Sequence, residues 1–159
     1  MESNVPPLVS DAAPSRILGL DVGDRRIGVA VSDQLGITAQ PVLTLVRTNR
    51  RQDLRSLARL MRKYSCTEVV VGNPLYMSGD LSPQAVKAQL FAQALREEMG
   101  VVVHLWDERL STTEAHRHLD EAGRAPSARR AVIDQVAAVL ILQAFLDARA
   151  FAQRSSVGS

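Results

Sequence analysis

Two short apolar segments joined by a tight turn constrain the fold of this chain more than any other feature. Arg16–Asp21 and Ile27–Asp33 have the composition of buried strands, and only Val22–Arg26 separates them. A crossover between parallel strands needs a dozen or more residues, so this pair must form an antiparallel hairpin. A third extended segment, Ile37–Val46, contains Pro41, which suits an edge strand or a bulge because proline has no backbone N–H. The chain is therefore predicted to begin with three antiparallel strands.

From Asn49 the hydrophobic period changes to that of a helix. One face of this predicted helix is apolar and the opposite face is basic, with Arg51, Arg55, Arg59 and Arg62 at i+4 and i+3 spacing. The apolar face consists of Leu54, Leu57, Ala58, Leu60 and Met61.

Strands and helices then alternate. The apolar segment Glu68–Gly72 predicts a strand, and Ser82 followed by Pro83 predicts the capped start of a helix that runs to about Met99 and ends at Gly100. Val101–Trp106 predicts the last strand.

The final third of the chain predicts two helices. Ser111–Glu114 has the spacing of a capping box and opens a helix that stops near Gly123, and a long helix is expected from Ala131 to Ala150. The predicted order β-β-β-α-β-α-β-α-α indicates an α/β domain with a mixed five-stranded sheet and helices on both faces. Residues 15–150 form this domain, between a flexible leader at 1–14 and a flexible tail at 151–159.

Composition narrows the functional class. A length of 159 residues fits one domain and excludes a two-lobed enzyme. The single cysteine, Cys66, excludes an internal disulfide framework and a multi-cysteine zinc site, which indicates a reducing compartment. No signal peptide is visible, and the most apolar run, Val136–Leu146, is shorter than the roughly 20 residues that span a bilayer, so a cytoplasmic protein is expected.

Three acidic residues from distant segments are candidates for one site. Asp21 and Glu108 follow strands whose carboxyl ends are expected to meet at one edge of the sheet. Asp134 lies in a helix with apolar residues on nearly every side, so part of it should be buried, and a buried carboxylate needs a partner. Taken singly, each acid has an ordinary interpretation as a helix cap or an ion-pair partner.

The donor set favours a hard cation. Three carboxylates with no neighbouring His or Cys suit Mg²⁺ or Mn²⁺ better than zinc. Two such ions about 3.5–4 Å apart can activate water and stabilise the leaving oxygen of a phosphodiester. The hypothesis is a two-metal site held by Asp21, Glu108 and Asp134 that hydrolyses a phosphate ester.

Four segments in order resemble the YqgF family, also called RuvX. They are Gly19–Asp33, Val69–Gly79, Trp106–Ala115 and Asp134–Gln143. The resemblance implies a ribonuclease H-like fold and a nuclease that processes the 5′ end of precursor 16S ribosomal RNA or resolves Holliday junctions. It also implies that Asp21, Glu108 and Asp134 are the catalytic, metal-binding carboxylates.

The expected contacts with nucleic acid come from four parts of the chain. Arginine dominates the cationic residues, since Lys63 and Lys87 are the only lysines in a chain of formal charge +2. Guanidinium groups suit bidentate phosphate contacts. Arg109 has an equally plausible interpretation as an ion-pair partner of Asp107 or Glu114. The predicted contacts are Arg25, Arg26, Asn73, Tyr76, Arg109, Arg124, Arg129 and Arg130.

Two other functions fit parts of the sequence. Asp21-Val22-Gly23 also resembles the phosphate loop of the actin and Hsp70 superfamily, although that superfamily clamps ATP between two lobes. A catalytically silent nucleic-acid-binding module would retain the fold without cleavage. If the substrate is a four-way junction, symmetric cutting favours a twofold homodimer, which Cys66 could cross-link under oxidation unless it is a buried, inert thiol.

Overall fold

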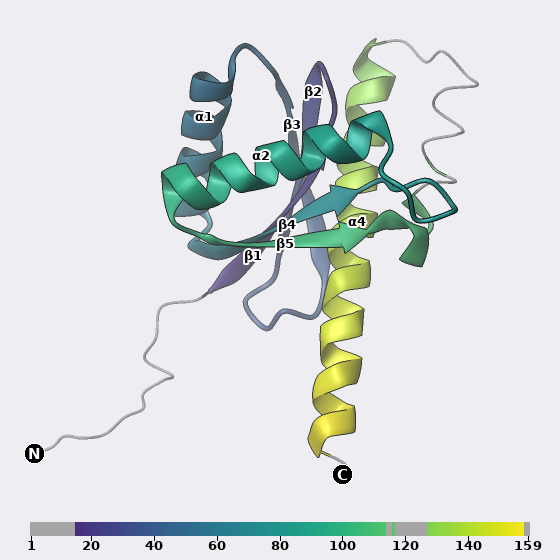
Figure 1. The fold of residues 1–159 in the computed structure, drawn as a ribbon. Helices are drawn as coiled ribbons and strands as arrows, with labels where there is room; N and C mark the ends of the chain where they lie inside the picture. Colours follow the sequence, from purple (N-terminus) through teal and green to yellow (C-terminus); the bar gives the residue numbers. More distant parts are fainter. Residues whose placement is uncertain (1–14, 114–115, 117–126, 158–159) are drawn as a thin grey trace, which may run out of the picture.

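The computed structural model describes residues 15–113, 116 and 127–157 of the chain (Figure 1). Its helices and strands follow the predicted order, and most boundaries differ from the predicted ones by one or two residues. The elements are β1 (Arg16–Val22), β2 (Arg26–Ser32), β3 (Ala39–Val46), α1 (Arg50–Lys63), β4 (Cys66–Asn73), α2 (Pro83–Met99), β5 (Val102–Asp107), the 3₁₀ turn η3 (Glu108–Leu110) and α4 (Ser127–Val157).

The strands form one sheet in the order β3-β2-β1-β4-β5. β1, β2 and β3 pair antiparallel, while β4 and β5 run parallel to β1. This mixed five-stranded sheet confirms the predicted α/β architecture. Pro41 lies on the edge strand β3 opposite Ala30, where the register between β2 and β3 shifts, so both expectations for this proline are confirmed.

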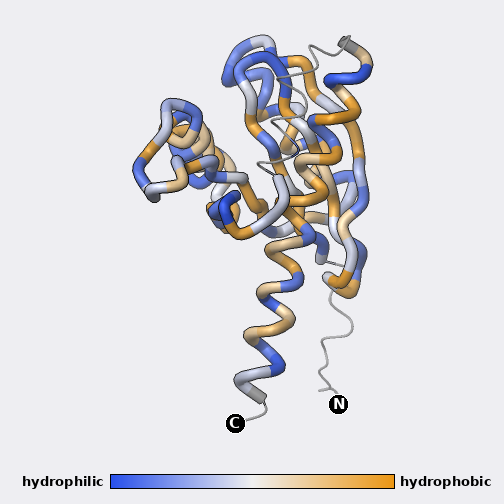
Figure 2. The backbone as a smooth tube through the Cα atoms, turned by 90° about the vertical axis from the view of Figure 1, so that its right-hand side faces the viewer, coloured by the Kyte–Doolittle hydropathy of each residue, from blue (hydrophilic) through white to orange (hydrophobic). Residues whose placement is uncertain are grey.

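Helices cover both faces of the sheet. Figures 1 and 2 show α1 and α2 on one side and α4 on the other. Alternate residues of β1 face the two layers: Leu18 and Leu20 pack in the core beneath α1 and α2, whereas Ile17 packs in the core beneath α4. The two-residue period of β1 therefore directs Asp21 to the α4 face, the same face as Ile17.

Local sequence signals set the helix ends, and those at Ser82 and Gly100 are as predicted. The side chain of Asn49 accepts a hydrogen bond from the backbone N–H of Gln52 at the start of α1, and Ser82 accepts one from Ala85 at the start of α2. α2 ends at Gly100, whose φ of 65° is in the left-handed region.

Glycines in the sheet let α4 approach the strands closely. A Cβ atom at Gly28 of β2 would lie 2.0 Å from the carbonyl oxygen of Asp134, and one at Gly19 of β1 would lie 2.7 Å from Cβ of Leu142. Ala137 and Ala138 of α4 are fully buried, so small residues on the helix also allow this approach. The backbone of α4 therefore lies directly on β1 and β2.

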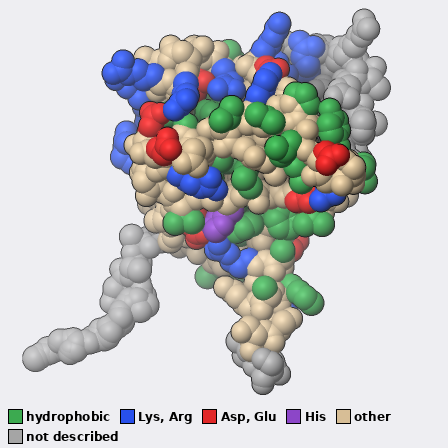
Figure 3. Space-filling model, viewed as in Figure 1, with side chains coloured by type: hydrophobic (Ala, Val, Ile, Leu, Met, Phe, Trp, Pro, Cys, Tyr) green, Lys and Arg blue, Asp and Glu red, His purple; other side chains and the backbone are tan. Residues whose placement is uncertain are grey.

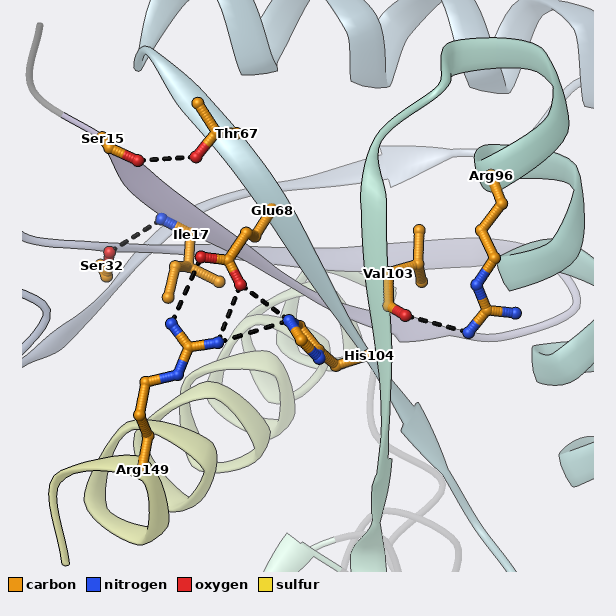
Figure 4. A network of polar contacts seen from close by, with 9 residues as sticks. All are labelled: Ser15, Ile17, Ser32, Thr67, Glu68, Arg96, Val103, His104 and Arg149. Carbon is orange, nitrogen blue, oxygen red and sulfur yellow. Dashed lines mark hydrogen bonds and ion pairs between the residues drawn. The ribbon is translucent and has the colours of Figure 1, made fainter. Parts of the chain in front are cut away.

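A polar network fixes the second half of α4 to the sheet (Figure 4). Arg149 donates two hydrogen bonds to Glu68 of β4, at 2.8 and 3.3 Å, and His104 of β5 lies 2.7 Å from the same carboxylate. The guanidinium of Arg149, with a smaller contribution from His104, holds the pKa of Glu68 below its ordinary value. This ionic contact keeps α4 aligned with the sheet beyond its apolar contacts.

α4 is longer than the sequence analysis predicts. It begins at Ser127 and continues through Phe151 to Val157, where a flexible tail is expected, because the next helix-breaking residue is Gly158. Within the described residues, Ala128–Ser156 is long and apolar enough to cross a membrane by length and composition. The same segment supplies Ile141, Leu142 and Leu146 to the core beneath α4.

Two further expectations meet the structure only in part. Most of the helix predicted between Ser111 and Gly123 lies outside the described residues. Cys66 is the first residue of β4 and not part of a loop, and burial raises the pKa of its thiol to about 11. This half-buried, protonated thiol matches the inert alternative better than the cross-linking one.

Candidate active site

Asp21 occupies the carboxyl-terminal end of β1 on the face that α4 covers. Its side chain is 4% exposed. Its partner in the antiparallel register is Gly28, and residues opposite each other in such a pair project to the same face. Because Gly28 has no side chain, the space beside Asp21 is filled by the backbone of α4 at Asp134. The hairpin and the helix together enclose the Asp21 carboxylate.

Glu108 reaches the same face from the far side of β4. It is the first residue of η3, directly after β5, and is 1% exposed. A Cβ atom at Gly72 of β4 would lie 2.5 Å from Oε2 of Glu108, so the carboxylate rests on the backbone of β4. Since β4 lies between β1 and β5, this conformation directs Glu108 toward the β1 end that carries Asp21.

Asp134 lies on α4 above Gly28 and is held by Arg26. The Nε atom of Arg26 donates to Oδ2 of Asp134 at 2.6 Å, and the two side chains are 23% and 17% exposed. The predicted partial burial is confirmed, but the charge that accompanies Asp134 in this structure is a guanidinium. Arg26, which is predicted to contact a phosphate, is therefore paired with Asp134 within the site in this structure.

A small cavity opens beside this ion pair. Its volume is about 280 Å³, and it is lined by Gly23, Asp24, Arg25, Arg26 and Asp134. Two arginines thus line a hollow next to the candidate carboxylates. Asp24 and Asp134 balance the charge of these arginines, so a phosphate here would pair with a guanidinium and not with the wall as a whole.

The acidic side chains of the site supply oxygen donors, the kind that a hard cation binds. Within residues 15–113, 116 and 127–157, no group of three or more His, Cys, Asp or Glu side chains is arranged to hold one. Asp21 and Glu108 nevertheless provide buried carboxylate oxygens at one edge of the sheet, the donors that Mg²⁺ and Mn²⁺ prefer. The chemistry of the donors fits such an ion, while the pairing of Asp134 with Arg26 occupies the third carboxylate.

Arg109 forms an ion pair with Asp107, one of the two roles that the sequence predicts for it. Its Nε and Nη2 atoms contact both oxygens of Asp107, the shortest at 2.7 Å, and Nη1 donates to the carbonyl of Met77. Hydrogen bonds from Arg109 lower the pKa of Asp107. Arg109 therefore anchors the loop after β4 to the end of β5, next to Glu108.

Asn73 and Tyr76, predicted as nucleic-acid contacts, have different surroundings. Asn73 is buried at the end of β4, and its Oδ1 accepts a hydrogen bond from Gln89 of α2 at 3.3 Å. Asn73 therefore faces α2, on the opposite face of the sheet from Asp21. Tyr76 lies in the following loop and is 53% exposed, as a side chain that stacks on a base would be.

The predicted arginine cluster before Asp134 is described only in part. Arg124 lies outside the described residues. Arg129, in the first turn of α4, is exposed. The Nε atom of Arg130 is buried and has no hydrogen-bond partner among the residues that the structure describes. Arg130 thus carries a donor that an anion at this end of α4 would satisfy.

Sequence reasoning missed the role of the strand glycines. Gly28 and Gly72 place α4 and Glu108 against the sheet, and the Arg26–Asp134 pair joins residues 108 positions apart. The available signal was a glycine inside each of two apolar strands, which often marks a close approach of another backbone.

Most of the chain matches one known protein family. Residues 15–148 match the family RuvX, described as Holliday junction resolvase. The chain belongs to the RuvX family. Among RuvX relatives, a protein of Moorella thermoacetica is 52% identical over 132 residues, covering 83% of this chain and 94% of its own, and one of Myxococcus xanthus is 51% identical over 133 residues, covering 84% and 88%. Both bear the name "Putative pre-16S rRNA nuclease".

A solved structure supports the RuvX fold independently. The chain is similar to Thermus thermophilus RuvC in complex with a Holliday junction substrate, with a TM-score of 0.52 and 16% identity over 85% of this chain and 95% of that one. The fold is ribonuclease H-like, as the resemblance in sequence implies. Membership in RuvX favours the nuclease prediction over the ATP-binding alternative.

Proposed function

We propose that this chain is a nuclease that hydrolyses phosphodiester bonds in structured nucleic acid. The first candidate reaction is 5′-end processing of pre-16S ribosomal RNA, and the second is resolution of four-way DNA junctions. One observation carries the proposal. In a chain of the RuvX family, Asp21 and Glu108 are buried on one face at the carboxyl ends of parallel strands, and Asp134 lies on the helix above them.

The two buried carboxylates act from fixed positions. Burial of a carboxylate is unfavourable unless other groups compensate it, so two buried carboxylates at neighbouring strand ends are candidates for chemistry. Asp21 is held by the register of β1 with β2, and Glu108 by its contact with the backbone at Gly72. Neither position depends on a long flexible loop, which keeps the carboxylates in place when a substrate approaches.

A divalent cation fits the proposed reaction. Asp21, Glu108 and Asp134 would hold Mg²⁺ or Mn²⁺, as one or two ions, and such an ion supplies an activated water and stabilises the leaving oxygen of the phosphodiester. Arg26 competes with a cation for Asp134, because both are positive partners of the same carboxylate. Once released, the guanidinium stands at the wall of the adjacent cavity, where a phosphate can take the place of Asp134.

Arginines around the site would bind the substrate backbone. Arg25 and Arg26 line the cavity beside Asp134, and Arg129 and Arg130 lie one turn earlier on α4. The remaining buried donor of Arg130 supports this assignment. Arg109 would act indirectly: its ion pair with Asp107 fixes the residues on either side of Glu108.

The proposal also covers the cellular location and the oligomeric state of the protein. Precursor ribosomal RNA and chromosomal junctions are both reached in the cytoplasm, where a reduced Cys66 is stable. A twofold homodimer is expected if the substrate is a four-way junction, since two symmetric cuts are then required. Sedimentation of the chain with and without a junction tests this expectation.

The test is a cleavage assay with a matched pair of variants. Purified chain is incubated with a 5′-extended 16S precursor fragment and with a four-way DNA junction, each with Mg²⁺ or Mn²⁺. Asp21→Asn is expected to reduce cleavage by about 10²-fold or more, while binding without cleavage persists. Asp147→Asn makes the same change on an exposed acid of α4, about three turns beyond Asp134, and is expected to retain activity. Binding without cleavage by the parent chain would favour the silent module.

A further inference from the structure

The outer face of α1 carries positive charge without the partners that a surface helix ordinarily has. Arg51, Arg55 and Arg59 are exposed and lie at i+4 spacing on one line of the helix, which we define as the α1 stripe. The only acid in α1, Asp53, is buried, where it accepts hydrogen bonds from Arg47 and from the backbone of Thr48. Among the described residues, no ion pair or hydrogen bond involves a stripe side chain.

The α1 stripe is unfavourable for the fold by itself. Like charges at i+4 spacing repel one another, and Arg51 lies in the first turn of the helix, where the macrodipole favours acids. Neither the core nor the cap needs these charges, because the core contacts come from the apolar face of α1 and the cap is Asn49. A charge pattern that opposes helix stability in this way points to an anionic partner.

The stripe is continuous with the candidate active site. A cavity of about 450 Å³ joins the start of α1 to the β1–β2 turn, and its charged lining consists of Arg25, Arg47 and Arg50 together with Asp24 and Asp53. The turn residues Asp24 and Arg25 also line the cavity beside Asp134. Figure 3 shows Lys and Arg side chains gathered over α1 at the upper left and again along the upper edge. Arginines therefore follow one another from α4, over the turn, to the start of α1, with Asp24 and Asp53 among them.

The length and spacing of the stripe fit a phosphate backbone. Successive stripe residues are separated by about 6 Å along the axis, and α1 as a whole spans about 21 Å. A nucleic-acid strand presents one phosphate per 3.4 Å or so of helix axis, so each stripe residue meets a new phosphate every one to two nucleotides. The stripe lies on the opposite face of the sheet from α4, so a bound strand must pass over the β1–β2 turn.

We infer that the α1 stripe is a second binding surface, which holds the phosphate backbone of the substrate RNA at a distance from the bond that is cut. This inference rests on the proposed nuclease function and adds the path that the bound RNA follows away from the cleavage site. It assigns Arg51, Arg55 and Arg59 to binding and not to cleavage, since they lie outside the cavity beside Asp134.

The test compares three variants on two probes. The stripe variant is Arg51→Gln, Arg55→Gln and Arg59→Gln together. A charge-conserving variant replaces the same residues with Lys. A charge-matched control carries Arg16→Gln, Arg96→Gln and Arg154→Gln, which lie at the start of β1 and in the last turns of α2 and α4, off the α1 stripe. The long probe is a structured RNA that reaches from the Asp21 edge along all of α1, and the short probe covers the Asp21 edge alone.

Salt dependence of binding is the readout, measured without a divalent cation. For the long probe, the stripe variant is expected to reduce the slope of log K against log salt by about 2 to 3, as loss of three phosphate contacts requires, and to weaken binding at least tenfold. The Lys variant and the control keep the parent slope, and the short probe does not distinguish the proteins. The melting temperature of the stripe variant should equal or exceed that of the parent, because repulsion is removed.

The outcomes separate this inference from the proposed function. A parent chain that binds neither RNA probe contradicts the proposed RNA-processing reaction itself. A parent chain that binds the long probe while the stripe variant matches the charge-matched control contradicts the stripe alone. Binding of the parent to vesicles of anionic lipid through the stripe, without a stripe effect on the long RNA, would assign the surface to a membrane and overturn the inference.

Discussion

Replacing Gly28 with alanine tests whether the close packing of α4 on β2 determines the position of Asp134 in the site. The added Cβ atom would lie 2.0 Å from the carbonyl oxygen of Asp134 and 2.5 Å from its carbonyl carbon, where ordinary contacts begin at 3.4 Å. Both neighbours are backbone atoms, so no change of rotamer relieves the clash. α4 must rise from β2 by more than about 1 Å, or the strand must bend away by a similar amount.

The energetic cost follows from what α4 buries. Ile141, Leu142 and Leu146 are at most 2% exposed, and full burial of each such side chain contributes about 1.5–3 kcal/mol. A gap of about 1 Å removes up to half of the dispersion energy at a contact. Together with strain from overpacking, the expected loss of stability is about 2–4 kcal/mol. In a domain of this size, that loss lowers Tm by about 5–15 °C.

Thermal unfolding followed by circular dichroism measures the effect. Gly100→Ala serves as the control, because nothing lies within 4 Å of its added Cβ and only its φ of 65° opposes the change, at about 1 kcal/mol. Nuclease activity of Gly28→Ala should fall at temperatures well below its Tm, since Asp134 moves relative to Asp21. A Tm within about 2 °C of the parent chain would refute the close seating of α4 on β2.

Three other predictions concern stability, the thiol and the site. Because the pKa of Glu68 is lowered from its ordinary 4.5, its pair with Arg149 stabilises the fold above that pH. Arg149→Met should therefore lower the midpoint of urea unfolding at pH 7. The difference in midpoint between the variant and the parent chain should vanish as the pH falls below 4.5. A constant difference down to pH 3 would contradict this account. With a thiol pKa of about 11, Cys66 should react with a thiolate-specific reagent at pH 8 far more slowly in the native chain than in 6 M guanidinium, and equal rates would show that burial does not protect it. Arg26→Gln should strengthen binding of Mn²⁺ in a titration by about tenfold, by freeing Asp134, whereas weaker binding would mean that Arg26 helps to build the site.

Much of the fold follows from local signals in the sequence. Asn49, Ser82 and Gly100 set helix ends through hydrogen bonds and a backbone angle that these residue types favour, and Pro41 marks the edge strand. These effects act over a few residues, so they are visible without the tertiary structure. The extent of α4 was underestimated, because its last turns follow from the distance to Gly158 and from the contact of Arg149 with Glu68.

The candidate site was predicted less completely, because its details depend on contacts between distant segments. The strand ends identified Asp21 and Glu108, which the structure buries on one face. The pairing of Arg26 with Asp134 has no local signature, since both residues have several possible partners in an unfolded chain. The orientation of Asn73 toward α2 depends on the parity of its position along β4, and a shift of one residue in the expected strand would reverse it.

The glycines beneath α4 make the two sides of the sheet unequal in their tolerance of mutation. At Gly19, Gly28 and Gly72, even one methyl group meets atoms at 2.7 Å or less. The opposite layer packs through long side chains such as Leu57, Phe91 and Leu95, which can adjust their rotamers to a change in volume. Stabilising substitutions should therefore be sought among α1 and α2, because a side chain at Gly28 would meet backbone atoms of α4 that no change of rotamer can move.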